Sequence, residues 1–354
     1  MSESDAPPAA ARKRSSRRAG RHPTVADVAR EAGVSPMTVS RVINGSASVQ
    51  PETRARVEEA IARIGYVPNP AAQALAGARQ VRIAVVHDNP SAAFLSELLV
   101  GCLAQAARDN AQIVVQSSLG HSEPEALAGA LARARVDGAI LPPPLGDDAV
   151  ILSALRARGI ALVLVAAGDP EADIPFVRVD DFAAALDMTR HILSRGHRRI
   201  GFIRGSPNQA ASARREAGFE AGLAEAGLSP DSALVAQGDF SWRSGLDAAE
   251  ALLAQNPPPE AIFASNDDMA AAAISAAHRR GLEVPRDLAV YGFDDTAVAT
   301  MVWPGLTTIR QPVADMAREA TDILARAIRE AAAGSAPEPR QMIVPFALIE
   351  RDSG

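Results

Sequence analysis

The stretch EAGVSPMTVSRVINGS (residues 31–46) predicts the end of one helix, a tight turn and the start of a second helix. Gly33 can end the first helix because glycine tolerates the left-handed conformation. Ser35 can cap the second helix, and Pro36 fits its first turn, where a missing N–H costs nothing. Two helices joined by a glycine turn are typical of the helix-turn-helix motif, whose second helix lies in the DNA major groove.

The flanking residues complete a small helical module. Thr24 and Asp27 form a capping-box pattern, because the hydroxyl and the carboxylate are placed to satisfy unpaired N–H groups at the start of the first helix. Pro51 opens a third helix, so the sequence predicts three short helices over residues 24–64. We therefore expect a helix-turn-helix DNA-binding domain over residues 23–67.

One face of the second helix has no evident core role. Val39 and Val42 are expected to face the core of the module. Met37 and Arg41 are four residues apart and so share another face, which stays free for contact with something outside the module.

The charge is divided unevenly along the chain. Residues 1–80 hold twelve Lys and Arg against seven Asp and Glu, a net charge of +5. The remaining 274 residues hold 24 against 35, a net charge of −11. A basic head on an acidic body is typical of a nucleic-acid-binding protein with a separate sensing domain.

Composition excludes several classes of protein. The sequence has no apolar run near the ~20 residues that cross a membrane, and its charged N-terminus lacks the apolar centre of a signal peptide. We therefore expect a cytoplasmic protein without a membrane partner. The single cysteine, Cys102, excludes an internal disulfide framework and a cysteine-based zinc site, and it is expected to be a buried apolar residue.

Two segments of the N-terminal part are expected to lack stable structure of their own. Residues 1–22 are poor in apolar residues and rich in Pro, Ala, Ser and Arg, which predicts a disordered basic tail. Residues 68–79 contain a helix pattern of about six residues, too short to be stable alone in water. This segment is expected to be a hinge helix or linker.

From residue 80 onward, short strand patterns alternate with alanine-rich helix patterns. The strand patterns are VRIAVVHD, AQIVVQSS, DGAILPP, IALVLVA, FVRVDD, RRIGFIRG, PEAIFASND and DLAVYGFDD. This alternation predicts doubly wound parallel sheets with helices on both faces. Ligands of such sheets bind outside the carboxyl ends of the strands, where this chain places polar or turn-forming clusters. The fold class is α/β, with the helical module preceding a core of residues 80–354.

Taken together in order, the motifs resemble the LacI/GalR family of bacterial transcription regulators. The run TVADVAREAGVSPMTVSRVING and the later TRARVEEAIARIGYVPNPAAQALAG are similar to the family's headpiece and hinge. SRGHRRIGFI, REAGF, SNDDMA, VYGFDDT and LTTIRQP are similar to its core. The resemblance covers residues 24–350 and implies a two-lobed core like that of periplasmic binding proteins, which binds an effector and forms a homodimer.

The resemblance also implies which residues contact double-stranded, pseudopalindromic operator DNA. Pro36, Met37 and Arg41 match the base-reading positions, and the Arg41 fork can donate to guanine O6 and N7. Leu75 matches the hinge leucine that wedges into the minor groove. The full set of DNA-binding candidates is Thr24, Ser35, Pro36, Met37, Thr38, Ser40, Arg41, Asn44 and Leu75. A capping role for Thr24 and Ser35 is compatible with this assignment.

A second set of residues matches the family's effector-binding positions. It comprises Asp88, Asn89, Phe94, Arg215, Phe240, Trp242, Asn266, Asp294 and Gln311. The family usually binds a sugar, a sugar phosphate or a nucleobase, and a carboxylate with an arginine suits vicinal hydroxyls. We therefore expect a carbohydrate-type effector. Asn266 could instead cap a helix, and Phe240 could belong to the core. Ala166 stands where a polar residue often follows the fourth strand, which makes a familiar galactoside or purine pocket doubtful.

Other functions fit less well. A transporter's solute-binding protein shares the two-lobed core but would require a signal peptide and no helix-turn-helix. A glycosidase using Asp294 and Asp295 is disfavoured, because adjacent strand residues point to opposite faces and cannot flank one bond at ~5–10 Å. We expect no enzyme activity, cofactor or metal. The sequence predicts an effector-controlled repressor, and it leaves open an activator or dual regulator and a nucleobase or sugar-phosphate effector.

Overall fold

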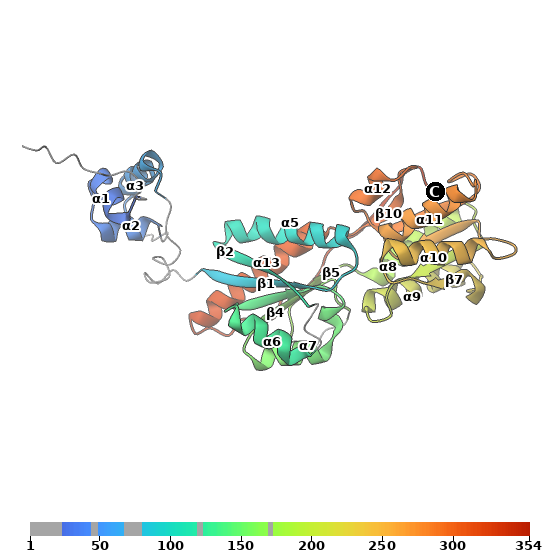
Figure 1. Ribbon diagram of the computed structural model, residues 1–354, viewed down its shortest axis with the longest axis horizontal. Helices are drawn as coiled ribbons and strands as arrows, with labels where there is room; N and C mark the ends of the chain where they lie inside the picture. Colours follow the sequence, from blue (N-terminus) through green and yellow to red (C-terminus); the bar gives the residue numbers. More distant parts are fainter. Residues whose placement is uncertain (1–22, 44–48, 67–79, 119–122, 169–172) are drawn as a thin grey trace, which may run out of the picture. The chain divides into compact units, whose positions relative to one another are not determined.

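The computed structural model describes residues 23–43, 49–66, 80–118, 123–168 and 173–354 (Figure 1). The expected tail (1–22) and hinge (68–79) lie outside these residues, as do Asn44 and Leu75. Within the described ranges, none of the helices is both long and apolar enough to cross a bilayer.

Contacts divide the chain into two compact units, Met1–Gln80 and Val81–Gly354. The first unit contains three helices in its described part: α1 (Val25–Ala32), α2 (Pro36–Ile43) and α3 (Pro51–Ile64). Its core is built from residues that include the fully buried Val28, Val39 and Val57, one from each helix. The three predicted helices are therefore present.

The turn between α1 and α2 has the geometry that its sequence predicts. Gly33 ends α1 with a φ of 64°, in the left-handed region. The side chain of Arg56 on α3 donates from Nη2 to the backbone oxygen of Ala32 at 2.6 Å. This bond ties the third helix to the turn and fixes the direction in which α2 leaves it.

The second unit has two lobes, and each lobe is built on a six-stranded sheet. In the first lobe the strand order is β11-β5-β4-β3-β1-β2, and every pair of neighbours is parallel. The strands are β1 (Val81–His87), β2 (Ala111–Ser117), β3 (Gly138–Leu141), β4 (Ala161–Val165), β5 (Phe176–Arg178) and β11 (Gln341–Ile343). The helices are α5 (Ala92–Arg108), α6 (Pro124–Arg133), α7 (Ala149–Ala157) and α13 (Val313–Ala332), with a 3₁₀ turn η1 (Leu145–Asp147).

The second lobe has the strand order β12-β10-β9-β8-β6-β7. Its strands are β6 (Ile200–Arg204), β7 (Val235–Gln237), β8 (Ala261–Ala264), β9 (Ala289–Asp294), β10 (Thr307–Arg310) and β12 (Ala347–Ile349). Its helices are α8 (Asp181–Ser194), α9 (Ala210–Glu225), α10 (Trp242–Leu253), α11 (Asp267–Arg279) and α12 (Ala297–Met301), with a 3₁₀ turn η2 (Ser232–Leu234). The pair β10–β12 is antiparallel, so the sheet is parallel except at this edge.

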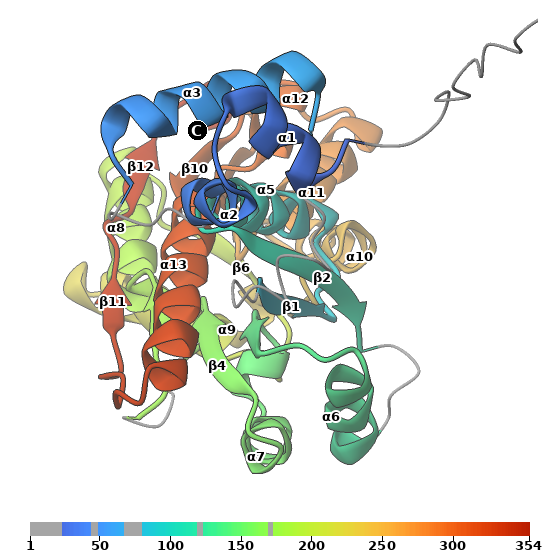
Figure 2. The same ribbon diagram turned by 90° about the vertical axis from the view of Figure 1, so that its left-hand side faces the viewer.

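Helices cover both faces of each sheet, as expected for a doubly wound fold. In the first lobe α5 and α13 lie side by side on one face, and α6 and α7 cover the other (Figure 2). Cys102 is fully buried among the residues of α5 and α13, and burial raises the pKa of its thiol to about 11. In the second lobe α10 and α11 cover one face, and α8 and α9 cover the other.

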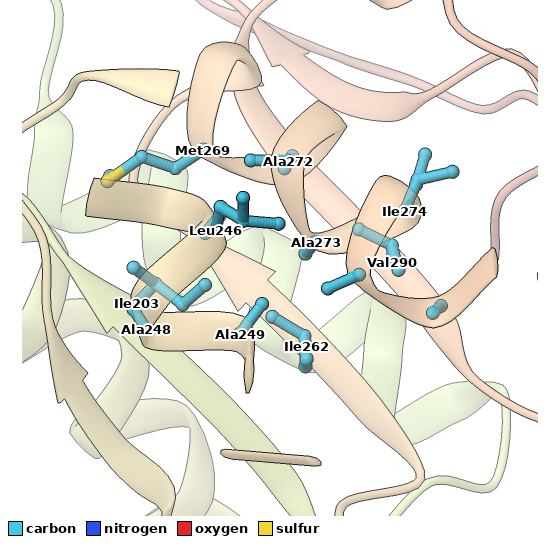
Figure 3. Packing of buried hydrophobic residues seen from close by; sticks show 14 of the residues in the cluster. Ile203, Leu246, Ala248, Ala249, Ile262, Met269, Ala272, Ala273, Ile274 and Val290 are labelled. Atoms are coloured by element: carbon cyan, nitrogen blue, oxygen red, sulfur yellow. The ribbon is translucent and has the colours of Figure 1, made fainter. Parts of the chain in front are cut away.

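The core between α10, α11 and the second sheet is rich in alanine (Figure 3). Ala249 of α10 and Ala272 and Ala273 of α11 are fully buried, and they pack beside the larger Ile262 and Val290 of the sheet. Small side chains allow the helices to approach the sheet closely, while the branched residues fill the remaining space. This packing holds the ends of β8 and β9 in place at the edge where polar residues follow the strands.

The chain passes between the lobes three times: after β5, after β10 and after β11. Neither lobe is therefore made from one continuous segment of sequence.

Candidate functional site

The α2 helix presents two different faces. Val39 and Val42 are buried in the core of the helical unit, whereas the side chain of Met37 is 64% exposed and Arg41 is also exposed. Pro36, at the first position of the helix, is exposed as well. Pro36 and Met37 in the first turn and Arg41 in the last turn thus offer apolar surface and a guanidinium fork to a partner. This combination can read thymine methyl groups and guanine edges.

Two of the hydroxyl residues predicted to contact DNA, Thr24 and Ser35, cap the starts of α1 and α2. Thr24 and Asp27 form the predicted capping box, with the Thr24 N–H donating to Asp27 Oδ2 at 3.0 Å. The Thr24 hydroxyl bond lowers the pKa of Asp27 to about 2. At the next helix the Thr38 N–H donates to Ser35 Oγ at 3.1 Å. Ser35 is exposed, and Thr38 and Ser40 are half-buried.

A pocket with about 340 Å³ of empty space lies between the two lobes of the second unit. The first lobe contributes residues that follow β1, β3 and β4. The second contributes residues at or after the ends of β6, β7, β8, β9 and β10. This is the place where doubly wound sheets bind ligands. The lining residues are Asn89, Ser91, Phe94, Pro143, Ala166, Gln209, Ala211, Arg215, Phe240, Asn266, Asp294 and Gln311.

Arg215 of α9 is the cation of this pocket, and it is 4% exposed. Its Nε donates to Asp181 Oδ1 at 2.8 Å, and its Nη1 donates to the backbone oxygen of Ser265 at 2.5 Å. The guanidinium lies 3.6 Å from the ring centroid of Phe293, and Nη1 is 3.8 Å from Asp294 Oδ1. The charge is thus largely neutralised by carboxylates, and the side chain is fixed before any ligand arrives.

Asp294 and Gln311 form a polar pair at the ends of β9 and β10. Gln311 Nε2 donates to Asp294 Oδ1 at 2.6 Å. Gln311 Oε1 is buried and has no hydrogen-bond partner among the described residues. Burial raises the pKa of Asp294 to about 7, although Arg215 and Gln311 act to lower it. The pair therefore offers an unused acceptor and a carboxyl group to hydroxyl groups of a ligand.

Asn266 and Phe240 are joined by a hydrogen bond. Asn266 caps α11 by accepting from the Met269 N–H at 3.0 Å, and its Nδ2 donates to the backbone oxygen of Phe240 at 2.9 Å. Phe240 is 5% exposed and packs against Gly205, where a Cβ atom would lie 1.9 Å from the ring. The capping role expected as an alternative for Asn266 is present, and both residues also line the pocket.

The structure brings seven of the nine effector-binding candidates together and leaves two outside the pocket lining. Asp88 is exposed after β1, and Trp242 at the start of α10 is 46% exposed. Sequence reasoning missed Ser91, Pro143, Gln209 and Ala211, which reach the pocket from loops and helix starts. It also missed Asp181, for which the RVDD run after a strand pattern was the available signal.

Asp295, next to Asp294, has a structural role. Its carboxylate accepts from Arg310 Nε and from Arg351 Nη2, each at 2.6 Å. These bonds join β10 and the segment after β12 to the end of β9. The two neighbouring carboxylates therefore do not act as a pair on one ligand.

Across the part of the chain that the structure describes, no group of His, Cys, Asp and Glu side chains could hold a metal ion.

Comparison with known proteins identifies the two kinds of domain in the chain. Residues 24–69 match the bacterial regulatory proteins of the lacI family, and residues 189–354 match the periplasmic binding protein-like domain. The HTH-type transcriptional regulator CelR of Thermobifida fusca is 35% identical, over 94% of this chain and 99% of CelR.

Two solved structures are similar over nearly the whole chain. A complex of the transcriptional regulator CelR with cellobiose is 34% identical, with a TM-score of 0.71, and the match covers 94% of this chain and 100% of that one. The lac repressor dimer bound to operator and the anti-inducer ONPF is 28% identical, with a TM-score of 0.73, and the match covers 94% of this chain and 99% of that one.

Proposed function

This chain belongs to the LacI family of bacterial transcription regulators, and we propose that it is a repressor whose operator affinity is controlled by a small, uncharged carbohydrate. We assign DNA reading to residues 23–67, the hinge to residues 68–79, and effector binding and dimerisation to residues 80–354. The protein acts in the cytoplasm, on the nucleoid, and performs no catalytic step.

The assignment of a carbohydrate effector rests mainly on the polar pair Asp294–Gln311. The two side chains approach at 2.6 Å and leave Gln311 Oε1 as an acceptor without a partner among the described residues. Sugar hydroxyls can donate to both, and Phe240 adds an aromatic ring to the same wall of the pocket.

The charge of the pocket favours a neutral ligand over a phosphorylated one. Arg215 already binds Asp181 and lies beside Asp294, so its charge is not available to an additional anion. A phosphate in this pocket would face Asp294 with no unpaired cation among the described lining residues. This argues against the sugar-phosphate alternative. The CelR complex with cellobiose shows a carbohydrate ligand in a related protein.

A thermal-shift screen of the full chain tests the effector class. A ligand present at ~100 times its dissociation constant should stabilise the protein by ~2.7 kcal/mol, which corresponds to about 5–10 °C for a unit of this size. We expect a shift with neutral mono- or disaccharides, cellobiose among them, and none with sugar phosphates or nucleobases. A shift with only a phosphate or a nucleobase would overturn the carbohydrate assignment.

Two matched variants locate the ligand once a carbohydrate is found. Asp294→Asn removes the acceptor charge from the pocket, whereas Asp88→Asn makes the same change at an exposed residue outside the lining. We expect calorimetry to show at least tenfold weaker binding for Asp294→Asn and unchanged binding for Asp88→Asn. Equal affinities of the two variants would contradict the pocket assignment.

Base reading by Arg41 is tested with operator sequences selected from random DNA. Arg41→Ala removes the guanidinium from α2, and Arg30→Ala removes an exposed arginine from α1. Losing one bidentate base contact costs ~1–3 kcal/mol of discrimination. We expect Arg41→Ala to lose the preference for the selected operator over random DNA at matched salt, and Arg30→Ala to keep it. An unchanged preference in Arg41→Ala would show that another residue reads the base.

We also propose that the chain acts as a homodimer through exposed apolar residues of the second unit. Val100 and Leu103 of α5 and Val115 of β2 are 57%, 56% and 51% exposed. Met301 and Trp303 of the second lobe are 81% and 79% exposed. Contiguous exposed apolar side chains mark interaction surfaces, and α5 packs beside β2. Sedimentation of Trp303→Ser should show a weakened dimer, and an unchanged dimer would place the interface elsewhere.

A further inference from the structure

Among the described residues, two hydrogen bonds join the lobes beside the pocket. In the first of them Ser91 Oγ, in the first lobe, donates to Asp268 Oδ2 of α11, in the second lobe, at 2.6 Å. Ser91 also caps α5, and Asp268 lies in the first turn of α11. The bond therefore joins the beginnings of two helices on opposite sides of the pocket.

The second of these bonds is made by Asp147, at the end of the 3₁₀ turn η1 in the first lobe. Its Oδ1 accepts from the Gly168 N–H at 2.8 Å, within the same lobe. Its Oδ2 accepts from the Ala210 N–H at 3.1 Å, which is the first residue of α9 in the second lobe. A Cβ atom on Gly168 would lie 2.1 Å from the Cβ atom of Ala210, so the lobes touch here.

Helix α9 lacks a cap from its own sequence. Its N-cap residue, Gln209, makes no side-chain capping bond. The first N–H groups of a helix have no partner inside the helix and favour a negatively charged acceptor. Asp147 supplies this acceptor from the other lobe. When the lobes separate, the helix loses its cap and the carboxylate loses one of its two donors.

The neighbouring Asp148 shows that an acidic residue in this part of the chain need not bind across the lobe boundary. Asp148 caps α7 by accepting from the Val150 and Ile151 N–H groups, at 2.9 and 3.1 Å. Both donors belong to the first lobe, and Asp148 is exposed. Asp147 is half-buried, and burial raises the pKa of its carboxyl group. The two residues differ chiefly in whether their partners lie across the lobe boundary.

We propose that Asp147 is a positioning residue that binds the first N–H group of α9 and so holds the lobes closed over the pocket. We call this interlobe hydrogen bond the clasp, and Ser91–Asp268 is a second clasp. The inference rests on the proposed function, because an effector bound between the lobes shifts the balance of open and closed arrangements only if it contacts them differently. Asp147 touches no ligand in this scheme. It sets the population of the closed arrangement that brings both walls of the pocket together.

Spin-label distances on the full chain test the clasp without effector or DNA. Val150→Cys on α7 and Ala224→Cys on α9 place one label at an exposed position in each lobe. Cys102 is fully buried and its pKa is about 11, so it stays unlabelled at pH 7. Dilution with unlabelled protein restricts the measurement to labels within one chain.

Three variants in this background separate the clasp from simpler effects. Asp147→Asn keeps the shape but leaves one acceptor oxygen for two donors. Ala210→Pro removes the donor from the second lobe at the first helical position, where proline is tolerated. Asp148→Asn neutralises the adjacent charge and keeps a good helix cap. Circular dichroism establishes that each variant is folded.

We expect the first two variants to shift the distance distribution toward longer values, with at least a fivefold rise in the open fraction. Asp148→Asn should match the parent chain. Unchanged distances in either Asp147→Asn or Ala210→Pro would overturn the proposal, as would an equal shift in Asp148→Asn. A carbohydrate screen without any shift would overturn the proposed effector class and leave the clasp standing.

Discussion

Replacing Arg215 by methionine should expose how much of the pocket depends on one buried cation. Methionine keeps an unbranched apolar stem that can still pack on Phe293, so the substitution removes mainly the charge and its hydrogen bonds. Asp181 would lose its 2.8 Å partner, and Asp294 would lose the cation 3.8 Å away. Both carboxylates are buried, with residue exposures of 2% and 6%.

The expected cost is large because the partners stay behind. Removing one member of a buried ion pair typically costs ~3–5 kcal/mol, since the remaining charge is left without compensation. For a unit of this size each kcal/mol lowers the melting temperature by ~2–4 °C, so we expect a decrease of about 10 °C. The loss should be smaller at pH 5 than at pH 8, because Asp294 binds a proton at the lower pH and is then neutral.

Calorimetric melting with two further variants checks this reasoning. Arg243→Met removes an exposed arginine of α10 that pairs with Asp247 at 3.3 Å, and it should change stability by at most ~0.5 kcal/mol. Arg215→Met combined with Asp181→Asn should recover at least ~1 kcal/mol of the loss, because the uncompensated charge is gone. A loss below ~1 kcal/mol in Arg215→Met, or a double variant less stable than the single one, would refute the argument.

Three further outcomes are expected. Gly205→Ala should displace Phe240, because its ring would lie 1.9 Å from the new Cβ. We expect calorimetry to show carbohydrate binding weakened at least tenfold. An unchanged affinity would show that the ring plays no part in binding. In Asp294 the pKa is about 7 in the folded protein and 3.8 as the reference value, so the folded state holds an extra proton between pH 4 and 7 and loses stability as pH rises through that interval. We therefore expect the free energy of unfolding, measured with denaturant, to fall less between pH 5 and pH 8 in Asp294→Asn than in the parent chain. Equal falls in the two proteins would contradict the raised pKa of Asp294. Thr24→Ala should destabilise α1 by ~1 kcal/mol in thermal unfolding of the helical unit, while Thr24→Ser retains the cap and serves as the control.

Local chemistry made the helical unit predictable from its sequence. The capping pair Thr24–Asp27, the left-handed Gly33 and the Ser35 cap each depend on residues within four positions of one another. The alternation of strands and helices in the core was equally visible, because buried parallel strands are short runs of branched apolar residues. These local patterns are enough to predict the fold class without any knowledge of long-range contacts.

Other elements carry too little local signal. Strands β7, β11 and β12 have three residues each, and they exist because a neighbouring strand offers its edge. β12 runs antiparallel to β10, which the alternating pattern does not reveal. Short edge strands of this kind are determined by tertiary contacts and not by their own propensity.

The site was predictable where polar residues directly follow strands and elusive elsewhere. Asn266 and Asp294 stand at strand ends, so the sheet itself places them in the pocket. Asp147 gains its role from a donor 63 residues away in the other lobe, which no spacing along the chain can indicate. Trp242 illustrates the converse: two residues after Phe240, it lies outside the pocket lining, because Phe240 has a φ of 72° and the chain turns there into α10.

The three passages of the chain between the lobes have a consequence for synthesis on the ribosome. The first lobe lacks α13 and β11 until residue 343 has been made, although its first strand starts at Val81. At ~5–20 residues per second, the apolar face of this sheet waits roughly 10–50 s for the helix that covers it. The nascent chain thus carries an uncovered hydrophobic surface through most of its translation, and chaperone demand should fall only when the last elements emerge.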